Sequence, residues 1–217
     1  MKRFLYSIAI VLLSLLFVSS SQNKNEVVLK HTNYTSTFSI SKKYPVMVEW
    51  WVTKAMVSCP TPLKRKDNFK PDPLLPQHTD IAKDYVGSGY DKGHVMPAAD
   101  NLCQTQKIQD ESFYFSNMMP QPHYSNAGPW KKIEIMTREL SLRYDSVRVW
   151  AGGIGSVKTF GENKVSVPSK TWKVIYIKKT KTFIAYIFPN SNEKITDVEL
   201  LRVKKEDVEK LTDLKFN

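Results

Sequence analysis

The thirteen residues 89–101, GYDKGHVMPAADN, place an imidazole beside charged side chains in a segment with no helical or strand periodicity. His94 is one of four histidines in the chain. Neutral imidazole titrates near neutral pH, so this side chain can act as a general base. Gly93 permits a close backbone approach and Pro97 stiffens the exit, which favours one fixed ring orientation. The alternative is a solvated or core histidine without a chemical role.

A second set of chemically competent side chains lies on a helix predicted from Asn126 to about residues 143–145. Asn126 can cap this helix, and Pro129 suits its first turn. Asn126, Glu134 and Arg138 are spaced i, i+8 and i+12, so they share one broad face. The opposite face carries core residues at spacings of three and four: Ile133, Met136 and Leu140. Alternatively, Glu134 and Arg138 only stabilise an exposed helix as an i, i+4 pair.

Runs rich in β-branched and aromatic residues predict the sheet that must position these groups. Strands are expected at about 27–30, 44–57, at the start of 113–130 before a loop at Pro120 and Pro122, and at 147–155, 169–179 and 182–190. The last two resemble a hairpin. Residues 59–80 contain five prolines and are predicted to be irregular, while 204–214 form a short amphipathic helix. This order indicates one α+β domain with a mainly antiparallel sheet.

The first residues have the composition of an export signal. Lys2 and Arg3 precede an uncharged apolar run at 4–18, followed by small polar residues. We therefore assign residues 1–21 to a signal peptide and 22–217 to the domain, and expect a periplasmic or extracellular protein. An uncleaved anchor is the alternative. After cleavage no stable membrane association is expected, because no later segment is apolar over a spanning length.

The body of the chain remains basic without its leader. Removing Lys2 and Arg3 from the 32 basic residues leaves 30 against 21 acidic ones, a net charge of +9. This balance favours polyanionic partners such as nucleic acid, acidic polysaccharide or an anionic membrane. A merely soluble basic protein is the alternative. The residues that could line an approach for phosphates, or form a solvated surface, are Lys64, Arg65, Lys66, Lys70, Lys131 and Lys132.

Two cysteines, Cys59 and Cys103, are present. In an oxidising compartment they can form one disulfide, and two buried free thiols are the alternative. A zinc site built on them is disfavoured, because no Cys-x-x-Cys or paired-histidine spacing occurs.

Four blocks of sequence carry a resemblance to a known family. They are DKGHVMPAAD at 91–100, SNMMPQ at 116–121, YSNAGPW at 124–130, and Glu134 with Arg138. In this order and spacing they resemble the DNA/RNA non-specific endonuclease family, which includes secreted bacterial nucleases and mitochondrial endonuclease G. The resemblance runs from the strand around Trp50 to 182–190. It implies an α+β, ββα-metal (His-Me finger) fold with a mainly antiparallel central sheet flanked by helices.

The resemblance also implies roles for individual residues. His94 matches the general base, and Asn126 matches the sole direct protein ligand to Mg²⁺, with Mn²⁺ as an alternative ion. Asn117 corresponds to a supporting asparagine of the active site. Glu134 corresponds to a carboxylate that holds water on the metal, and Arg138 to a cation near the scissile phosphate.

Two positions are assigned to substrate binding. Lys92 stands where the family usually has arginine, so a forked phosphate contact becomes a point contact. Arg65 is the nearest candidate for a second family arginine.

The resemblance therefore implies a Mg²⁺-dependent, sequence-non-specific endonuclease that hydrolyses DNA and RNA with a His-activated water and leaves 5′-phosphates. The first alternative is a catalytically impaired, nuclease-like protein that only binds nucleic acid. The second is a secreted adhesion domain for acidic glycans. The sequence does not define an oligomeric state.

Overall fold

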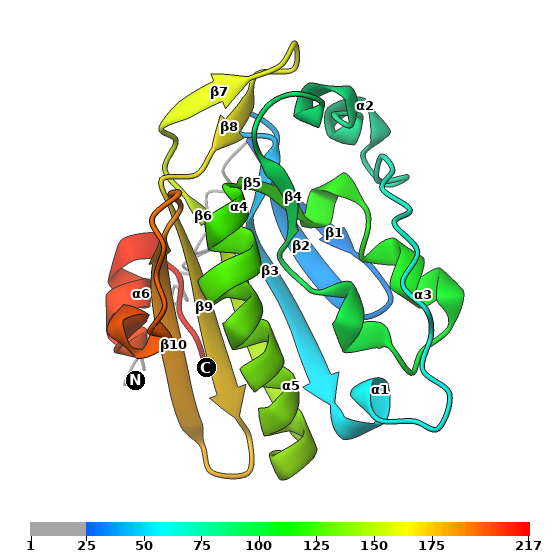
Figure 1. Ribbon diagram of the computed structural model, residues 1–217, viewed down its shortest axis with the longest axis vertical. Helices are drawn as coiled ribbons and strands as arrows, with labels where there is room; N and C mark the ends of the chain where they lie inside the picture. Colours follow the sequence, from blue (N-terminus) through cyan, green and yellow to red (C-terminus); the bar gives the residue numbers. More distant parts are fainter. Residues whose placement is uncertain (1–24) are drawn as a thin grey trace, which may run out of the picture.

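A seven-stranded sheet forms the centre of the computed structural model, which describes residues 25–217 (Figure 1). The strand order is β1-β2-β3-β6-β9-β10-β11, and every neighbouring pair is antiparallel. The strands are β1 Glu26–Lys30, β2 Tyr34–Ser39, β3 Tyr44–Thr53, β6 Ser146–Ile154, β9 Lys170–Ile177, β10 Thr182–Pro189 and β11 Arg202–Val203. The predicted signal peptide, residues 1–21, lies outside the described residues.

Each face of the sheet is covered by a different helix. Helix α5 (Lys131–Tyr144) crosses one face, and helix α6 (Lys205–Thr212) packs on the other near β10 (Figure 1). Alternation along β9 divides its side chains between the faces. Ile175 and Ile177 join the core under α5, while Trp172 and Val174 join the core under α6. The predicted α+β fold with an antiparallel sheet and flanking helices is confirmed.

Short elements fill the connections. The short helices are α1 Lys54–Val57, α2 Pro76–Thr79, α3 Gln106–Glu111 and α4 His123–Ser125. A two-stranded sheet of β7 (Lys158–Phe160) and β8 (Val165–Val167) projects beyond the central sheet. No helix within residues 25–217 is both long and apolar enough to cross a bilayer.

The segment around His94 contains a strand, where we predicted none. Strand β4 (Asp91–His94) pairs antiparallel with β5 (Met118–Gln121), and α5 follows along the chain. The loop predicted at Pro120 is wrong, because Pro120 lies in β5 opposite Lys92. A two-stranded ribbon has exposed edges, so it tolerates a proline that a central strand would not. A Cβ atom at Gly93 would lie 1.9 Å from Oε1 of Gln121, so any larger residue here would force the buried Gln121 side chain to move.

Three other boundaries differ from prediction. Strand β3 ends at Thr53 instead of Val57, because Lys54 N donates to Asp145 O and the chain turns into α1. The proline-rich segment contains the short helix α2. Asn126 does not cap α5. Its backbone is helical, and a wide π-type turn, Asn126–Trp130, joins α4 to α5. The predicted end of that helix near 143–145 and the β9–β10 hairpin are confirmed.

A disulfide joins Cys59 to Cys103. It connects the chain after α1 to the turn that follows Ala98–Asn101, where Cys103 N also donates to Met56 O. The sequence left this pairing open, and the structure contains the bridge. The proline-rich segment that begins at Cys59 is therefore fixed to the body of the domain at its start.

We expect the double substitution Cys59→Ser/Cys103→Ser to lower the free energy of unfolding by about 2–4 kcal/mol. The bridge spans 44 residues, and cross-linking such a loop restricts the unfolded chain. Urea unfolding with and without dithiothreitol measures the effect. Reduction should bring the wild-type chain to the stability of the variant and leave the variant unchanged. Two free thiols in the oxidised, folded wild-type chain would contradict the bridge.

Candidate active site

One cavity of about 300 Å³ brings together six of the seven predicted site residues. They are Arg65, Lys92, His94, Asn126, Glu134 and Arg138. The cavity is enclosed by β4, the π-type turn, α5 and the proline-rich segment. A larger cavity of about 920 Å³, between residues 71–88 and the β7–β8 turn, contains none of the predicted residues. We place the candidate site in the smaller cavity because the groups able to do chemistry converge there.

His94 ends strand β4 and is held by aromatic rings. Its backbone carbonyl accepts a 3.0 Å hydrogen bond from Nε1 of Trp130, which joins β4 to the start of α5. Phe69 and Phe113 contact the imidazole edge-on, with ring centroids 5.5 and 4.8 Å away. Nε2 is buried and has no hydrogen-bond partner among the described residues. Nδ1 makes no hydrogen bond with the described residues either, but it is not a buried atom. Nδ1 is therefore the nitrogen that is open to the cavity.

The surroundings of His94 keep its ring neutral. The pKa of His94 is lowered to about 3, mainly by burial against the two phenylalanines. The positive charge of Arg65 also lowers this pKa, by more than the negative charge of Asp67 raises it. A desolvated imidazole disfavours its charged form. At neutral pH the ring is therefore unprotonated and able to accept a proton at Nδ1.

Asn126 is oriented by Asp91, a carboxylate that the sequence placed beside His94 and did not connect to Asn126. Its Nδ2 donates to Oδ2 of Asp91 at 2.9 Å, and Nδ1 of His123 lies 3.0 Å from the same oxygen. The amide of Asn126 is thereby fixed with its nitrogen toward Asp91. Its carbonyl oxygen makes no hydrogen bond with residues 25–217 and is free for a ligand in the cavity.

The oxygen groups at this site fit a weakly coordinated, hard cation. No cluster of three or more His, Cys, Asp or Glu side chains that could hold a metal occurs within residues 25–217. Structural zinc sites require such clusters, whereas Mg²⁺ keeps several waters and uses few protein oxygens. The free oxygen of Asn126, with the Glu134 carboxylate on the same cavity, suits Mg²⁺.

Asn117 is the one predicted residue that does not line the cavity. Its fully buried Nδ2 donates to the carbonyls of Met96 and Ser112, each at 2.8 Å, and its Oδ1 accepts from Met96 N at 2.9 Å. These three hydrogen bonds hold the segment after His94 against the end of α3. In this structure Asn117 positions the base and does not face the cavity.

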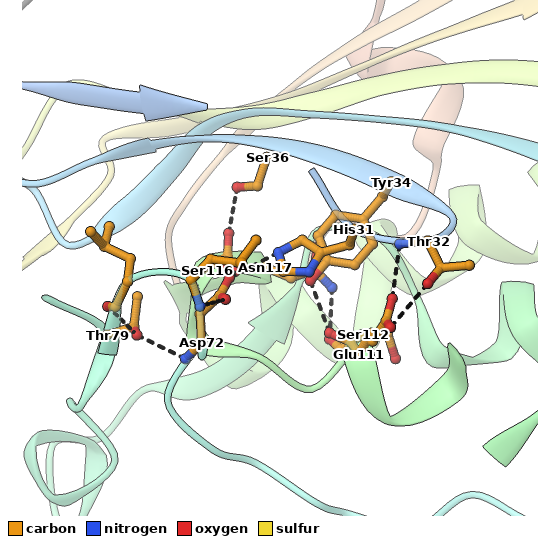
Figure 2. Close-up of polar contacts among 12 residues, drawn as sticks. His31, Thr32, Tyr34, Ser36, Asp72, Thr79, Glu111, Ser112, Ser116 and Asn117 are labelled. Atoms are coloured by element: carbon orange, nitrogen blue, oxygen red, sulfur yellow. Dashed lines mark hydrogen bonds and ion pairs between the residues drawn. The ribbon is translucent and has the colours of Figure 1, made fainter. Parts of the chain in front are cut away.

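A buried polar network continues from Asn117 to the first hairpin (Figure 2). The neighbouring Ser116 donates from Oγ to Asp72 and accepts at its carbonyl from Ser36. Nε2 of His31 lies 2.9 Å from Oδ2 of Asp72. Burial alone would raise the pKa of Asp72, but His31 and Ser116 outweigh it and hold the pKa below its usual range. Asp72 therefore links the β1–β2 turn to the support of the site.

Arg138 is anchored by a second buried carboxylate. Its guanidinium donates to Oδ1 of Asp100 at 3.1 Å, and Nε1 of Trp50 donates to Oδ2 of the same residue at 2.8 Å. Asp100 is 1% exposed, so these two donors satisfy a carboxylate that water does not reach. The other guanidinium nitrogens of Arg138 stay available to a ligand in the cavity.

Lys173 places a buried cation below Glu134. It comes from β9 and is 1% exposed, with its Nζ 4.0 Å from the ring centre of Trp130. Burial lowers the pKa of Lys173, and the nearby Glu134 counteracts part of that change. Burial likewise raises the pKa of Glu134, while Lys173 opposes the rise. Each charge offsets only part of the other's burial, so the pKa of Glu134 is raised to about 7 and the pKa of Lys173 is lowered to about 8.

Sequence reasoning missed Asp91, Asp100 and Lys173. Both aspartates lie within 91–100, next to the predicted base, but nothing in their spacing indicated which group each would hold. Lys173 had a detectable signal, because it occupies the same strand face as the buried Ile175 and Ile177. A lysine at an inward position of a strand indicates a buried charge partner.

Of the six basic residues predicted to line the approach, only Arg65 and Lys131 border the cavity. Lys64 and Lys66 are exposed elsewhere on the loop, and Lys132 donates to Thr196 O instead. Lys70 lies against Tyr114, with its Nζ 5.4 Å from the ring centre.

Two antiparallel strands followed by a helix, with a histidine on the first strand and an asparagine amide before the helix, define the ββα-metal class of nuclease fold. Comparison with known proteins agrees with this class. The model of the DNA/RNA non-specific endonuclease family matches residues 15–217. A solved structure of the EndoG/EndoGI complex, described as showing the mechanism of EndoG inhibition, superposes with a TM-score of 0.79 at 29% identity, covering 87% of this chain and 84% of that one.

Individual relatives are similar over most of the chain. The human mitochondrial nuclease EXOG is 32% identical over 209 residues, covering 86% of this chain and 55% of that protein. A nuclease of Nostoc sp. is 31% identical over 196 residues, covering 84% of this chain and 70% of that protein. The chain thus spans about half the length of the EXOG relatives it matches. It belongs to the DNA/RNA non-specific endonuclease family.

The low pKa of His94 should be visible in folding stability. The unfolded chain binds a proton at this residue below about pH 6.5, whereas the folded chain does so only near pH 3. His94 therefore lowers stability as pH falls from 6.5, and His94→Gln should remove this effect. Urea unfolding at pH 7.5 and 4.5 measures the effect. Between these pH values the free energy of unfolding should fall by on the order of 2 kcal/mol less in the variant than in wild type. If the difference in unfolding free energy between the two chains is the same at both pH values, the pKa of His94 is not lowered by folding.

Proposed function

We propose that this protein is a Mg²⁺-dependent endonuclease that hydrolyses DNA and RNA with little sequence preference and leaves 5′-phosphates. The observation that carries the proposal is the convergence of His94 and Asn126 on one cavity together with Glu134 and Arg138. Hydrolysis requires a proton acceptor for water, neutralisation of charge on the phosphate, and help for the leaving oxygen. The cavity contains a group for each task.

His94 serves as the general base in this proposal. Its Nδ1 is open to the cavity, and the buried ring is neutral at physiological pH. A positioned base of this kind contributes about 10²–10⁴-fold to rate. The hydrogen bond from Trp130 to its backbone and the clamp formed by Asn117 fix where this base stands.

Arg138 supplies positive charge at the phosphate. Asp100 holds one of its guanidinium nitrogens, so the side chain is pre-organised and loses little freedom when an anion binds. Lys92, Arg65 and Lys131 border the same cavity and contribute point charges that carry no sequence information. These contacts support cleavage without base specificity.

Asn126 is the residue that would hold Mg²⁺, with Asp91 setting its orientation and Glu134 accepting from the ion's water shell. When bound, the ion supplies charge neutralisation at the phosphate and at the leaving 3′ oxygen. Mn²⁺ shares the preference for oxygen ligands and is the natural substitute.

Export to a periplasmic or extracellular compartment is part of the same proposal. The leader composition of residues 1–21 supports it, and so does the Cys59–Cys103 bridge, because disulfides persist in oxidising compartments. Basic charge on an exported chain suits capture of free nucleic acid by long-range attraction.

Plasmid DNA incubated with the chain and Mg²⁺ should be nicked and then degraded, and a chelator should abolish the reaction. His94→Ala should slow cleavage by about 10²–10⁴-fold, because the proton acceptor is lost. His78→Ala removes a histidine outside the cavity and serves as the matched control. The products should accept labelled phosphate from a kinase only after phosphatase treatment. Plasmid that is retarded in a gel but intact under all metal conditions would favour the binding-only alternative.

Asp91→Ala should raise the Mg²⁺ concentration needed for half-maximal cleavage by about 10–100-fold, because the amide of Asn126 loses the partner that orients it. A titration of cleavage rate against Mg²⁺ measures the shift. Asp80→Ala, which removes an exposed carboxylate outside the cavity, is the control. The same Mg²⁺ dependence in both variants and wild type would remove Asp91 from the metal site.

A further inference from the structure

A second hollow of about 300 Å³ adjoins the active-site cavity. The residues that line it include Tyr124, Ala127, Gly128, Lys132, Lys194 and Ile195. Ala127 lines both hollows, so they meet at the π-type turn that carries Asn126. The second hollow therefore lies directly beside the cavity that contains the candidate active site.

The walls of this hollow are suited to a flat, apolar group. Tyr124 is 56% exposed, although large aromatic side chains usually bury most of their area. Its hydroxyl makes no hydrogen bond within residues 25–217. The half-buried Ile195 lies on the same hollow, and Ala127 and Gly128 add no polar side chain. An aromatic face left open beside an aliphatic wall is a platform on which a planar ring can stack.

Two lysines give the hollow positive charge. Nζ of Lys132 donates to Thr196 O at 2.7 Å, which fastens the segment 194–196 to the start of α5 and fixes the hollow's shape. Lys194 is exposed and forms no hydrogen bond or ion pair within the described part of the chain. Its ammonium group is therefore free to meet an anion at the rim of the hollow.

We propose that this hollow is a nucleotide subsite. In it, an unpaired base of the substrate strand stacks on Tyr124 beside Ile195, and a phosphate of the same strand meets Lys194. The proposal rests on the proposed nuclease function and extends it to a neighbouring nucleotide. Charge complementarity and continuity with the active-site cavity favour a nucleic-acid strand over any other occupant.

The chemistry of the hollow also determines which substrates use it. Every base has a stackable face, so an aromatic platform binds bases without reading their edges. A base paired within a duplex is already stacked on its neighbours and is not free to enter. The subsite should therefore strengthen binding of single-stranded DNA and RNA and contribute little to duplex binding.

The test measures binding of fluorescein-labelled oligonucleotides to chains that carry His94→Ala, which slows cleavage by about 10²–10⁴-fold and so keeps the oligonucleotides intact during the measurement. Fluorescence anisotropy is recorded with Mg²⁺ for a single strand, a duplex and an abasic strand of equal length. Adding Tyr124→Ala should weaken single-strand binding roughly tenfold, within the range for losing one base–aromatic stack. Tyr124→Phe keeps the ring and should retain affinity. The abasic strand should bind equally to the chains with and without Tyr124→Ala.

Lys194→Gln tests the phosphate contact separately. It should reduce the slope of log affinity against log salt by about 0.7 for the single strand, as expected for one lost contact. Lys210→Gln, an exposed lysine on α6, is the matched control and should leave the slope unchanged.

Equal single-strand affinity with and without Tyr124→Ala would overturn the subsite while leaving the proposed nuclease function intact. An equal loss on single strand and duplex would overturn the stacking of an unpaired base. If the His94→Ala chain binds no oligonucleotide and the chain with His94 cuts no plasmid, the proposed function fails and the subsite fails with it.

Discussion

The hydrogen bond from Trp130 Nε1 to the backbone carbonyl of His94 joins the two halves of the site. One partner ends a short strand and the other lies just before α5, and these elements carry the base and the metal-ligand candidate. Trp130 is itself fixed, because it is 1% exposed and packs edge-on against Phe188 of β10 at 5.2 Å. The indole ring of Trp130 thus links the position of the base to the central sheet.

Beneath this ring the protein buries a group of charges. Asp100 and Lys173 are each 1% exposed, and Arg138 and Glu134, which come from α5, line the cavity. Burying an ion is costly unless opposite charge and hydrogen bonds satisfy it, and removal of one partner leaves the other uncompensated. Here the two acidic side chains, Asp100 and Glu134, lie near two basic ones, Arg138 and Lys173. The face of Trp130 adds a cation–π contact to Lys173. The arrangement keeps Arg138 and Glu134 in defined positions at the cavity.

The spacing of apolar and β-rich residues predicted the elements that are defined by their own local sequence. Helix α5 followed from apolar spacings of three and four, and the β9–β10 hairpin followed from two β-rich runs. Strand β4 was missed because it has no apolar alternation, and the strand expected at the start of 113–130 begins only at Met118. The pairing of β4 with β5 depends on Gly93 fitting against Gln121 and on Trp130, which are distant in sequence. The capping role expected for Asn126 is wrong because α4 already supplies the preceding turn.

The same distinction applies to the site. Residue types and motifs indicated His94, Asn126, Glu134 and Arg138, since each carries a group that phosphate chemistry needs. They could not indicate Asp91 or Asp100, because an aspartate that orients another side chain differs from an exposed one only in its contacts. Asn117 shows the converse. The family motif contains it, yet its hydrogen bonds are all spent on Met96 and Ser112, so its influence on the base is through position.

A base that stays neutral beside an open cavity requires a wall that does not move. Phe69 forms part of that wall and comes from the proline-rich segment, which has little secondary structure of its own. The disulfide at Cys59 fixes this segment at one end. At the other end Phe115 N donates to Lys70 O, directly after Phe69. Because both ends are held to the domain, an irregular loop can exclude water from one side of the imidazole, while Arg65 on the same loop faces the cavity. Part of the desolvation that lowers the pKa of His94 therefore originates in a tethered loop outside the ββα core.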